Sequence, residues 1–172
     1  MVAHLFQLEL HQVEQAKEVI RQVWREHFGA HPDPDVRTFL DRAEAFGDLD
    51  AWNQTYAPPS GLFLVALDAG RPDARVVGTG GIRPVTTQPV ETRMAELTRM
   101  FLLREYRGQG WGRTMAERLI QFARDAGYRS TRLGTNKQLV ASHALYRSLG
   151  FRDIPAYEPG GERWAYYMGL TL

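Results

Sequence analysis

Apolar and polar positions along this chain repeat with two different periods, and these periods divide it into strands and helices. Residues 2–10 alternate as a strand does, and Gln12–Phe28 repeats apolar residues at helical spacing. Prolines and aspartates at residues 31–35 interrupt this helix, and the pattern then predicts a second helix over Val36–Phe46. Residues 47–60, which include two adjacent prolines, are expected to form a loop.

The rest of the chain alternates strands with two amphipathic helices. The helices are predicted over residues 110–126 and 139–149, and a glycine ends each of them. Turns at residues 68–73 and 86–92 join the first three strands of this part. The predicted strands are Leu62–Leu67, Val76–Val85, Met94–Leu103, Ser130–Leu133, Phe151–Ile154 and Trp164–Thr171. Because hairpins come first and crossover helices later, we expect an α/β (α+β) fold with a mixed, mostly antiparallel central sheet and helices on both faces.

Composition adds limits to this picture. The 172 residues are enough for one hydrophobic core and contain no repeat or linker, so one domain over residues 1–172 is expected. With 21 basic and 20 acidic residues the net charge is +1, which gives no reason to expect binding to nucleic acid or membranes. The chain has no cysteine, which excludes disulfides, cysteine nucleophiles and thiolate metal ligands.

Neither a signal peptide nor an apolar run near the roughly 18 residues of a membrane span is seen, so a cytoplasmic protein is expected. The histidines show no metal-ligand spacing, and no metal is expected. One of them, His143, is expected at the surface of the helix over residues 139–149.

A glycine-rich turn between the strand that ends near residue 103 and the helix that begins near residue 110 is the most informative segment. It reads Arg107-Gly108-Gln109-Gly110-Trp111-Gly112-Arg113. Glycines at alternate positions let the backbone approach a ligand closely. The first amides of the following helix have no partner inside the helix and lie at the positive end of its dipole. The turn is therefore predicted to bind phosphate.

Three common nucleotide-binding loops do not match this turn. A Walker loop ends in Gly-Lys-Ser/Thr, whereas Gly112 is followed by Arg113 and Thr114. A dinucleotide fingerprint has the spacing Gly-x-Gly-x-x-Gly and an acidic residue after the next strand, whereas here Asp125 lies within the helix. The glycine-rich loop of kinases connects two strands, and here a helix follows.

The turn fits instead the pattern Arg/Gln-x-x-Gly-x-Gly/Ala, and with the element order it resembles the GNAT superfamily of acyl-CoA-dependent N-acyltransferases. The segment Glu96–Leu102 resembles that family's central strand, and Ala144–Phe151 resembles its second signature. The resemblance covers residues 75–155 through motifs and the first 60 residues through element order alone. It implies a GNAT-like fold and acetyl-CoA as co-substrate.

The resemblance also implies which groups hold acetyl-CoA. The backbone of Met100, Phe101 and Leu102 would pair with the pantetheine arm; residues 100–103 can also be plain core strand, and both roles can hold together. The turn amides would hold the pyrophosphate, and the side chains of Arg107 and Arg113 would add charge-assisted bonds. The turn residues implied are Arg107, Gly108, Gln109, Gly110, Trp111, Gly112 and Arg113. Many relatives carry a pantetheine-binding asparagine where this chain has Leu139, and the nearby Asn136 is the candidate to replace it.

Two residues are candidates for proton transfer. An ammonium acceptor must lose a proton before or during the attack of its nitrogen, and Glu96 resembles the family's general base in its spacing before the turn. Tyr146 matches the family tyrosine near the cofactor sulfur and would act as general acid toward the departing thiolate. A structural glutamate and a half-buried helix tyrosine are the alternatives. Glu91 and Glu105 are weaker candidates for the base.

In the family, the acceptor pocket lies between segments that correspond to residues 27–46 and 156–164. Carboxylates that could attract a cationic amine there are Asp33, Asp35, Glu44, Asp48, Glu158 and Glu162, and Trp24, Trp52 and Trp164 are expected in the core or the pocket walls. The resemblance implies an N-acetyltransferase for a primary amine of a small molecule, such as an amino acid, a polyamine or an aminoglycoside. Two alternative functions stay open, namely a protein or peptide N-acetyltransferase and a non-catalytic acyl-CoA-binding or regulatory domain. The transferred acyl group can also differ from acetyl, and the protein can be a monomer or a homodimer.

Overall fold

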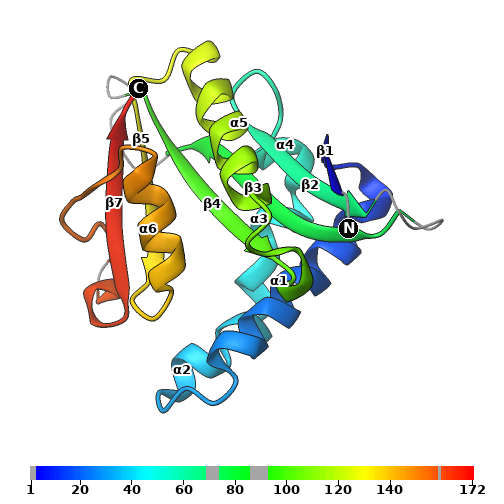
Figure 1. Cartoon of the computed structure of the whole chain (residues 1–172), viewed down its shortest axis with the longest axis vertical. Helices are drawn as coiled ribbons and strands as arrows, with labels where there is room; N and C mark the ends of the chain where they lie inside the picture. Colours follow the sequence, from blue (N-terminus) through cyan, green and yellow to red (C-terminus); the bar gives the residue numbers. More distant parts are fainter. Residues whose placement is uncertain (1–2, 69–73, 86–92, 159) are drawn as a thin grey trace.

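The computed structural model describes residues 3–68, 74–85, 93–158 and 160–172. One seven-stranded sheet with the order β1-β2-β3-β4-β5-β7-β6 forms its centre (Figure 1). Its strands are β1 (Ala3–Gln7), β2 (Leu62–Asp68), β3 (Val76–Pro84), β4 (Met94–Leu102), β5 (Ser130–Asn136), β6 (Arg152–Asp153) and β7 (Ala165–Thr171). All neighbouring strands described are antiparallel except β4 and β5, which are parallel. The expected mixed, mostly antiparallel sheet is confirmed.

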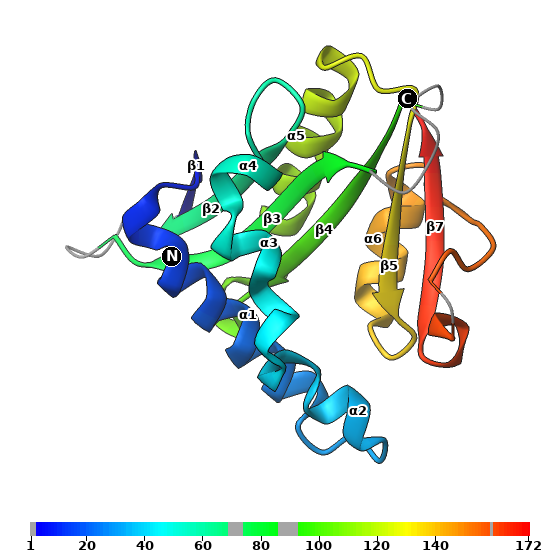
Figure 2. The ribbon, with the colours of Figure 1, turned by 180° about the vertical axis from the view of Figure 1, so that it is seen from behind.

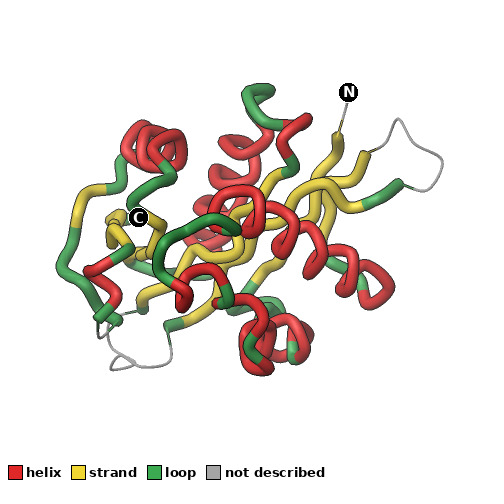
Figure 3. Tube along the Cα trace, turned by 90° about the horizontal axis from the view of Figure 1, so that it is seen from below, coloured by secondary structure: helices red, strands yellow, loops and turns green. Residues whose placement is uncertain are grey.

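Helices cover both faces of this sheet (Figure 3). On one face, α1 (Val13–Phe28) packs against β3 and β4, and α3 (Gly47–Asp50) and α4 (Trp52–Thr55) lie on the same side (Figure 2). On the other face, α5 (Trp111–Asp125) packs against β2, β3 and β4, and α6 (Val140–Ser148) lies beside β5 and β7 (Figure 1). The helical spacing of apolar residues turns Ile20 of α1 and Leu119 of α5 inward, where both are fully buried against the sheet.

The continuous helix predicted over residues 36–46 is wrong. This part consists of α2 (Pro34–Arg37) and two 3₁₀ turns (Phe39–Asp41 and Ala43–Phe46), and α3 begins directly after them at Gly47. Two backbone carbonyls here accept hydrogen bonds from distant side chains. Trp24 Nε1 donates to the Val36 carbonyl at 2.8 Å, and Arg99 Nη2 donates to the Ala45 carbonyl at 2.5 Å. These tertiary contacts hold the chain in short turns that helical spacing alone does not anticipate.

Most other predicted elements are present, with changed bounds. The loop expected over residues 47–60 contains the single turns α3 and α4, and the first strand ends at Gln7 instead of residue 10. β5 runs three residues further than expected, to Asn136. Of the turns predicted at residues 68–73 and 86–92, Asp68 belongs to β2, and residues 69–73 and 86–92 lie outside the described residues. In the described ranges, no helix has the length and apolar character needed to cross a membrane.

Two features of β4 prepare the site. Its parallel pairing with β5 covers only Met94–Glu96 opposite Ser130–Arg132, after which the two strands diverge (Figure 2). A β-bulge interrupts its pairing with β3, and Arg99 at this bulge has a φ of +56°. Thr79 of β3 donates from its hydroxyl to the Arg99 carbonyl at 2.7 Å. Beyond Glu96, the edge of β4 that faces β5 is therefore open.

Candidate active site

A cavity of about 270 Å³ lies where β4 and β5 separate, and we call it the central cavity. Met100 and Phe101 line it from β4, and Asn136 lines it from β5. Glu96 and Tyr146 line it as well, so five residues predicted from the sequence meet at one place. Leu102, also predicted, is not among the lining residues, and its carbonyl accepts a hydrogen bond from Arg107 Nε at 2.8 Å.

The glycine-rich turn follows β4 and a 3₁₀ turn at Arg104–Tyr106, and it leads into α5. Gly108 and Gly110 have φ angles of +73° and +88°, a conformation that residues with a side chain adopt at a cost. Apart from the adjoining residues, no atom of the described chain lies within 4 Å of where a side chain would begin at either glycine. Within the described chain, the amides of residues 108–113 donate to no acceptor outside α5. The turn thus presents free amides at a helix start, as an anion site requires.

The two arginines at the ends of this turn differ in their contacts. The guanidinium of Arg107 donates to both carboxylate oxygens of Glu26 in α1 at 2.9 Å, in addition to its bond with the Leu102 carbonyl. Hydrogen bonds from Arg107, with help from Arg104, lower the pKa of Glu26. Arg107 therefore braces the turn against α1. Arg113 is half-exposed at the start of α5 and donates to Ser148 Oγ at 2.6 Å.

Asn136 carries an unsatisfied group at the end of β5. Its Oδ1 accepts from the amide of Gln138 at 2.9 Å, but its buried Nδ2 has no hydrogen-bond partner in the described part of the chain. An unpaired buried donor costs about 1–3 kcal/mol. Because Asn136 lines the central cavity, a ligand carbonyl there would satisfy this donor.

Tyr146 lies on α6 with its ring 5.7 Å from that of Phe151. Burial raises the pKa of Tyr146 well above its ordinary value, so the hydroxyl keeps its proton at neutral pH. His143, expected at the surface, is buried, which makes that prediction wrong. Its Nε2 lies 2.9 Å from the Asn136 carbonyl, and its ring packs edge-on against Tyr166. The spacing of three residues from Tyr146 was the signal for a shared inner face.

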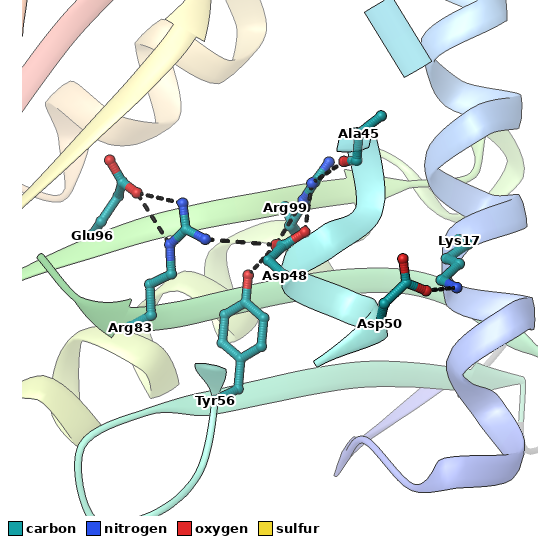
Figure 4. A network of polar contacts seen from close by, with 8 residues as sticks. All are labelled: Lys17, Ala45, Asp48, Asp50, Tyr56, Arg83, Glu96 and Arg99. Carbon is teal, nitrogen blue, oxygen red and sulfur yellow. Dashed lines mark hydrogen bonds and ion pairs between the residues drawn. The ribbon is translucent and has the colours of Figure 1, made fainter. Parts of the chain in front are cut away.

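Glu96 sits between two arginines in the sheet. Arg83 of β3 and Arg132 of β5 are its direct neighbours in the strand register. Arg83 donates from Nη2 at 2.9 Å and from Nε at 3.2 Å to Glu96 Oε2 (Figure 4). Arg132 Nε lies 3.6 Å from Glu96 Oε1. The two arginines hold the Glu96 carboxylate between β3 and β5 and fix its direction. Sequence reasoning missed both arginines, because no pattern fixes which residues face each other across strands.

Tyr157 completes the surroundings of Glu96. The guanidinium of Arg132 stacks on its ring at 3.8 Å. Burial, followed by the negative charges of Glu96 and Glu158, raises the pKa of Tyr157 far above its ordinary value. Tyr157 lines the central cavity and was not predicted from the sequence.

A second set of polar contacts centres on Asp48 of α3. Arg99 donates to its two carboxylate oxygens at 2.7 and 3.0 Å, and the Tyr56 hydroxyl donates to it at 2.6 Å (Figure 4). Arg83 Nη1 lies 3.9 Å away. Burial acts to raise the pKa of Asp48, but Arg99, Tyr56 and Arg83 together outweigh it, and the pKa is lowered. Figure 4 also shows the neighbouring pair of Lys17 and Asp50, whose atoms lie 2.5 Å apart.

The carboxylates expected to attract a cationic amine mostly have other partners. Asp33 accepts from the amide of Asp35 at the start of α2, and Asp35 lies 3.3 Å from Arg42. Glu158 accepts from the Tyr167 hydroxyl at 3.1 Å. Of the two weaker candidates for the base, Glu105 does not line the central cavity and forms an ion pair with Arg75, with 3.3 Å between Oε1 and Nη2. Glu91 lies outside the described residues.

Two further cavities adjoin the central one, and all three share Phe39. An aromatic side cavity of about 210 Å³ is lined by Trp24, Phe39 and Trp164. An arginine side cavity of about 280 Å³ is lined by Arg42, Arg83 and Arg99. Trp52 packs against the core instead. The described residues include no cluster of three or more histidines or carboxylates arranged to hold a metal ion.

Comparison with known proteins agrees with this geometry. The model of the acetyltransferase (GNAT) family matches residues 16–151. An uncharacterized N-acetyltransferase of Escherichia coli, YjgM, is 35% identical over 107 residues, which are 62% of this chain and 60% of that protein. Rat N-acetyltransferase 8B is 33% identical over 112 residues, which are 65% of this chain and 49% of that protein. The chain thus spans about half the length of these two relatives.

Solved structures show the same fold at lower identity. A GNAT-family acetyltransferase from Staphylococcus aureus superposes with a TM-score of 0.76 at 20% identity, covering 99% of both chains. The PaiA N-acetyltransferase of Thermoplasma acidophilum, solved in complex with coenzyme A, superposes with a TM-score of 0.74 at 18% identity, covering 100% of both chains.

Proposed function

Because the chain belongs to the acetyltransferase (GNAT) family, we propose that it transfers an acetyl group from acetyl-CoA to the primary amine of a small molecule. The observation that carries this proposal is the central cavity. It joins the open edge of β4 to Glu96 and Tyr146, the two groups suited to move protons. The name of a human relative, N-acetylaspartate synthetase, which is 32% identical over 121 residues, supports a small-molecule acceptor.

Three parts of the chain fit acetyl-CoA. The amides of residues 108–113 are placed to hold the pyrophosphate, and Gly108 and Gly110 leave room for it. The open edge of β4 at Met100 and Phe101 suits the amide-rich pantetheine arm. The unpaired Nδ2 of Asn136 donates to a carbonyl of that arm.

Bound acetyl-CoA supplies the thioester whose acyl carbon is transferred. Glu96 accepts the proton that the acceptor nitrogen loses as its bond to that carbon forms. Tyr146 donates a proton to the sulfur as the carbon–sulfur bond breaks, and burial keeps this proton in place until then. Arg83 and Arg132 fix the direction of the Glu96 carboxylate.

The test uses purified protein, acetyl-CoA and a panel of amines, with free thiol and acetylated product measured together. The panel contains amino acids, polyamines, aminoglycosides and short peptides with free N-termini. Acetylated small amines in equal amount to released CoA are the expected result. Transfer to peptides alone would replace the small-molecule acceptor by a peptide, and CoA binding without any transfer would favour the non-catalytic alternative.

A further inference from the structure

We propose that Arg83 makes this site selective for amine acceptors that also carry a carboxylate, of which α-amino acids are the simplest. This inference rests on the proposed function and narrows its acceptor class. It arises from a group of five side chains, which we call the charge cluster: Arg83, Arg99, Arg132, Asp48 and Glu96 (Figure 4 shows all but Arg132).

The charge cluster carries an excess of positive charge. Three guanidinium groups face two carboxylates, so one cation has no counter-charge within the cluster. The side chains are between 8% and 32% exposed, so water screens them only in part. Glu44 and Glu158 lie near the cavities but are exposed, and screening weakens their effect on the cluster. A bound anion would balance the cluster.

Arg83 is the member that can meet such an anion. Arg99 uses its guanidinium on Asp48 and on the Ala45 carbonyl. Arg132 stacks on Tyr157 and does not line any of the three cavities. Arg83 is the most exposed member at 32%, and it lines both the central cavity and the arginine side cavity.

Arg83 also has N–H donors that its two described carboxylate partners do not use. Its Nε and Nη2 both donate to Glu96 Oε2, and its Nη1 lies 3.9 Å from Asp48, beyond hydrogen-bond distance. A guanidinium has five N–H donors in one plane, which suits a carboxylate. Among the described residues, the N–H groups on Nη1 have no hydrogen-bond acceptor, which leaves them available to a ligand in the cavities.

An α-amino acid carries its ammonium and its carboxylate on one carbon atom. Glu96 and Arg83 offer the matching opposite charges side by side, with 2.9 Å between Oε2 and Nη2. The ammonium would face Glu96, its proton acceptor, and the carboxylate would face Arg83. A polyamine brings only positive charge to a cluster that already has an excess. Trp24, Phe39 and Trp164 can cover an apolar side chain of the acceptor.

The experiment compares acceptors that differ only in the carboxylate. One pair is L-phenylalanine and 2-phenylethylamine, and the other is L-methionine and 3-(methylthio)propylamine. Spermidine is added to represent the polyamines. For each acceptor kcat/KM is measured with the wild type, Arg83→Gln and Arg83→Lys. Arg25→Gln serves as the matched control, because Arg25 is an exposed arginine of α1 paired only with Glu18 among the ion pairs described.

We expect the wild type to prefer each amino acid over its matched amine by on the order of 10- to 100-fold. Arg83→Gln should abolish this preference, Arg83→Lys should keep part of it, and Arg25→Gln should leave it unchanged. Comparing the ratio within each pair separates anion recognition from any change in Glu96, because a misplaced base slows both members of a pair equally.

Three results would overturn the inference. An equal loss for both members of each pair in Arg83→Gln would mean that Arg83 only positions Glu96. A wild type that prefers spermidine or the matched amines would refute the inference and leave the transferase function intact. Retained CoA binding without transfer to any acceptor would refute the proposed function, and the inference with it. If Arg83→Gln fails to fold, the wild-type preference and Arg83→Lys decide.

Discussion

Replacing Asp48 by asparagine should destabilise the protein strongly. The Asp48 side chain is 8% exposed and that of Arg99 is 15% exposed, so this ion pair is largely removed from water. Removing one partner of a buried pair costs about 3–5 kcal/mol, because the other charge stays buried without compensation. Asparagine keeps the shape and part of the hydrogen bonding, so we expect the lower end, about 3 kcal/mol. For a chain of this size that is a fall in melting temperature of about 6–12 °C.

The stability lost in Asp48→Asn should also depend on pH. The pKa of Asp48 is lower in the folded protein than its ordinary value of about 3.9. Its contribution to stability is therefore complete above that value and is lost as the pH falls through the folded pKa. The difference in unfolding free energy between wild type and Asp48→Asn should be constant from pH 7 to about pH 5 and should shrink by pH 3.

Urea unfolding at pH 7, 5 and 3 measures both effects. Asp153→Asn is the matched control, because Asp153 and its partner Arg147 are exposed and their pair should contribute less than about 1 kcal/mol. A double-mutant cycle with Arg99→Gln isolates the coupling between Asp48 and Arg99. A loss of under about 1 kcal/mol at pH 7, or an unchanged difference at pH 3, would refute the reasoning.

Three further substitutions test the site. Gly110→Val forces a β-branched residue to φ +88° at the glycine-rich turn, so calorimetry should show CoA affinity weakened by on the order of 10-fold. The control Gly47→Ala, at an open position in α3, should leave CoA affinity unchanged. Asn136→Leu removes the unpaired donor and should raise the KM for acetyl-CoA about 10-fold with little change in melting temperature, while an unchanged KM would place the pantetheine arm elsewhere. Tyr146→Phe keeps the buried ring but removes the proton donor, so kcat should fall by on the order of 10²-fold or more at unchanged CoA affinity, and an unaltered kcat would remove Tyr146 from the chemistry.

The sequence predicted the elements that depend on local spacing. The apolar stripe of α5, the glycine-rich turn before it and the strands of the hairpins are found where the periodicity indicates. Glu96, Asn136 and Tyr146 were brought together by resemblance to a family, and all three line the central cavity. Elements set by local spacing, and site residues identified by a motif, could thus largely be predicted from the sequence.

Contacts between residues far apart in the chain could not be predicted from the sequence. The short turns of residues 34–50 exist because Trp24 and Arg99 bond to carbonyls that a helix would use itself. The neighbours of Glu96 depend on the register of three strands, and one residue of slip would turn Arg83 and Arg132 to the other face. Such pairings follow from the whole fold.

The measurement closest to the central claim is acetyl transfer by wild type and Glu96→Gln at equal saturation with acetyl-CoA. The wild type should form acetylated amine and free CoA in equal amounts. Glu96→Gln should bind CoA with unchanged affinity and transfer the acetyl group at least about 10²-fold more slowly at neutral pH, with the loss reduced at high pH where the acceptor amine is already neutral. Transfer at the wild-type rate by Glu96→Gln would contradict the role of Glu96, and a wild type that binds CoA but acetylates no amine would contradict the function itself.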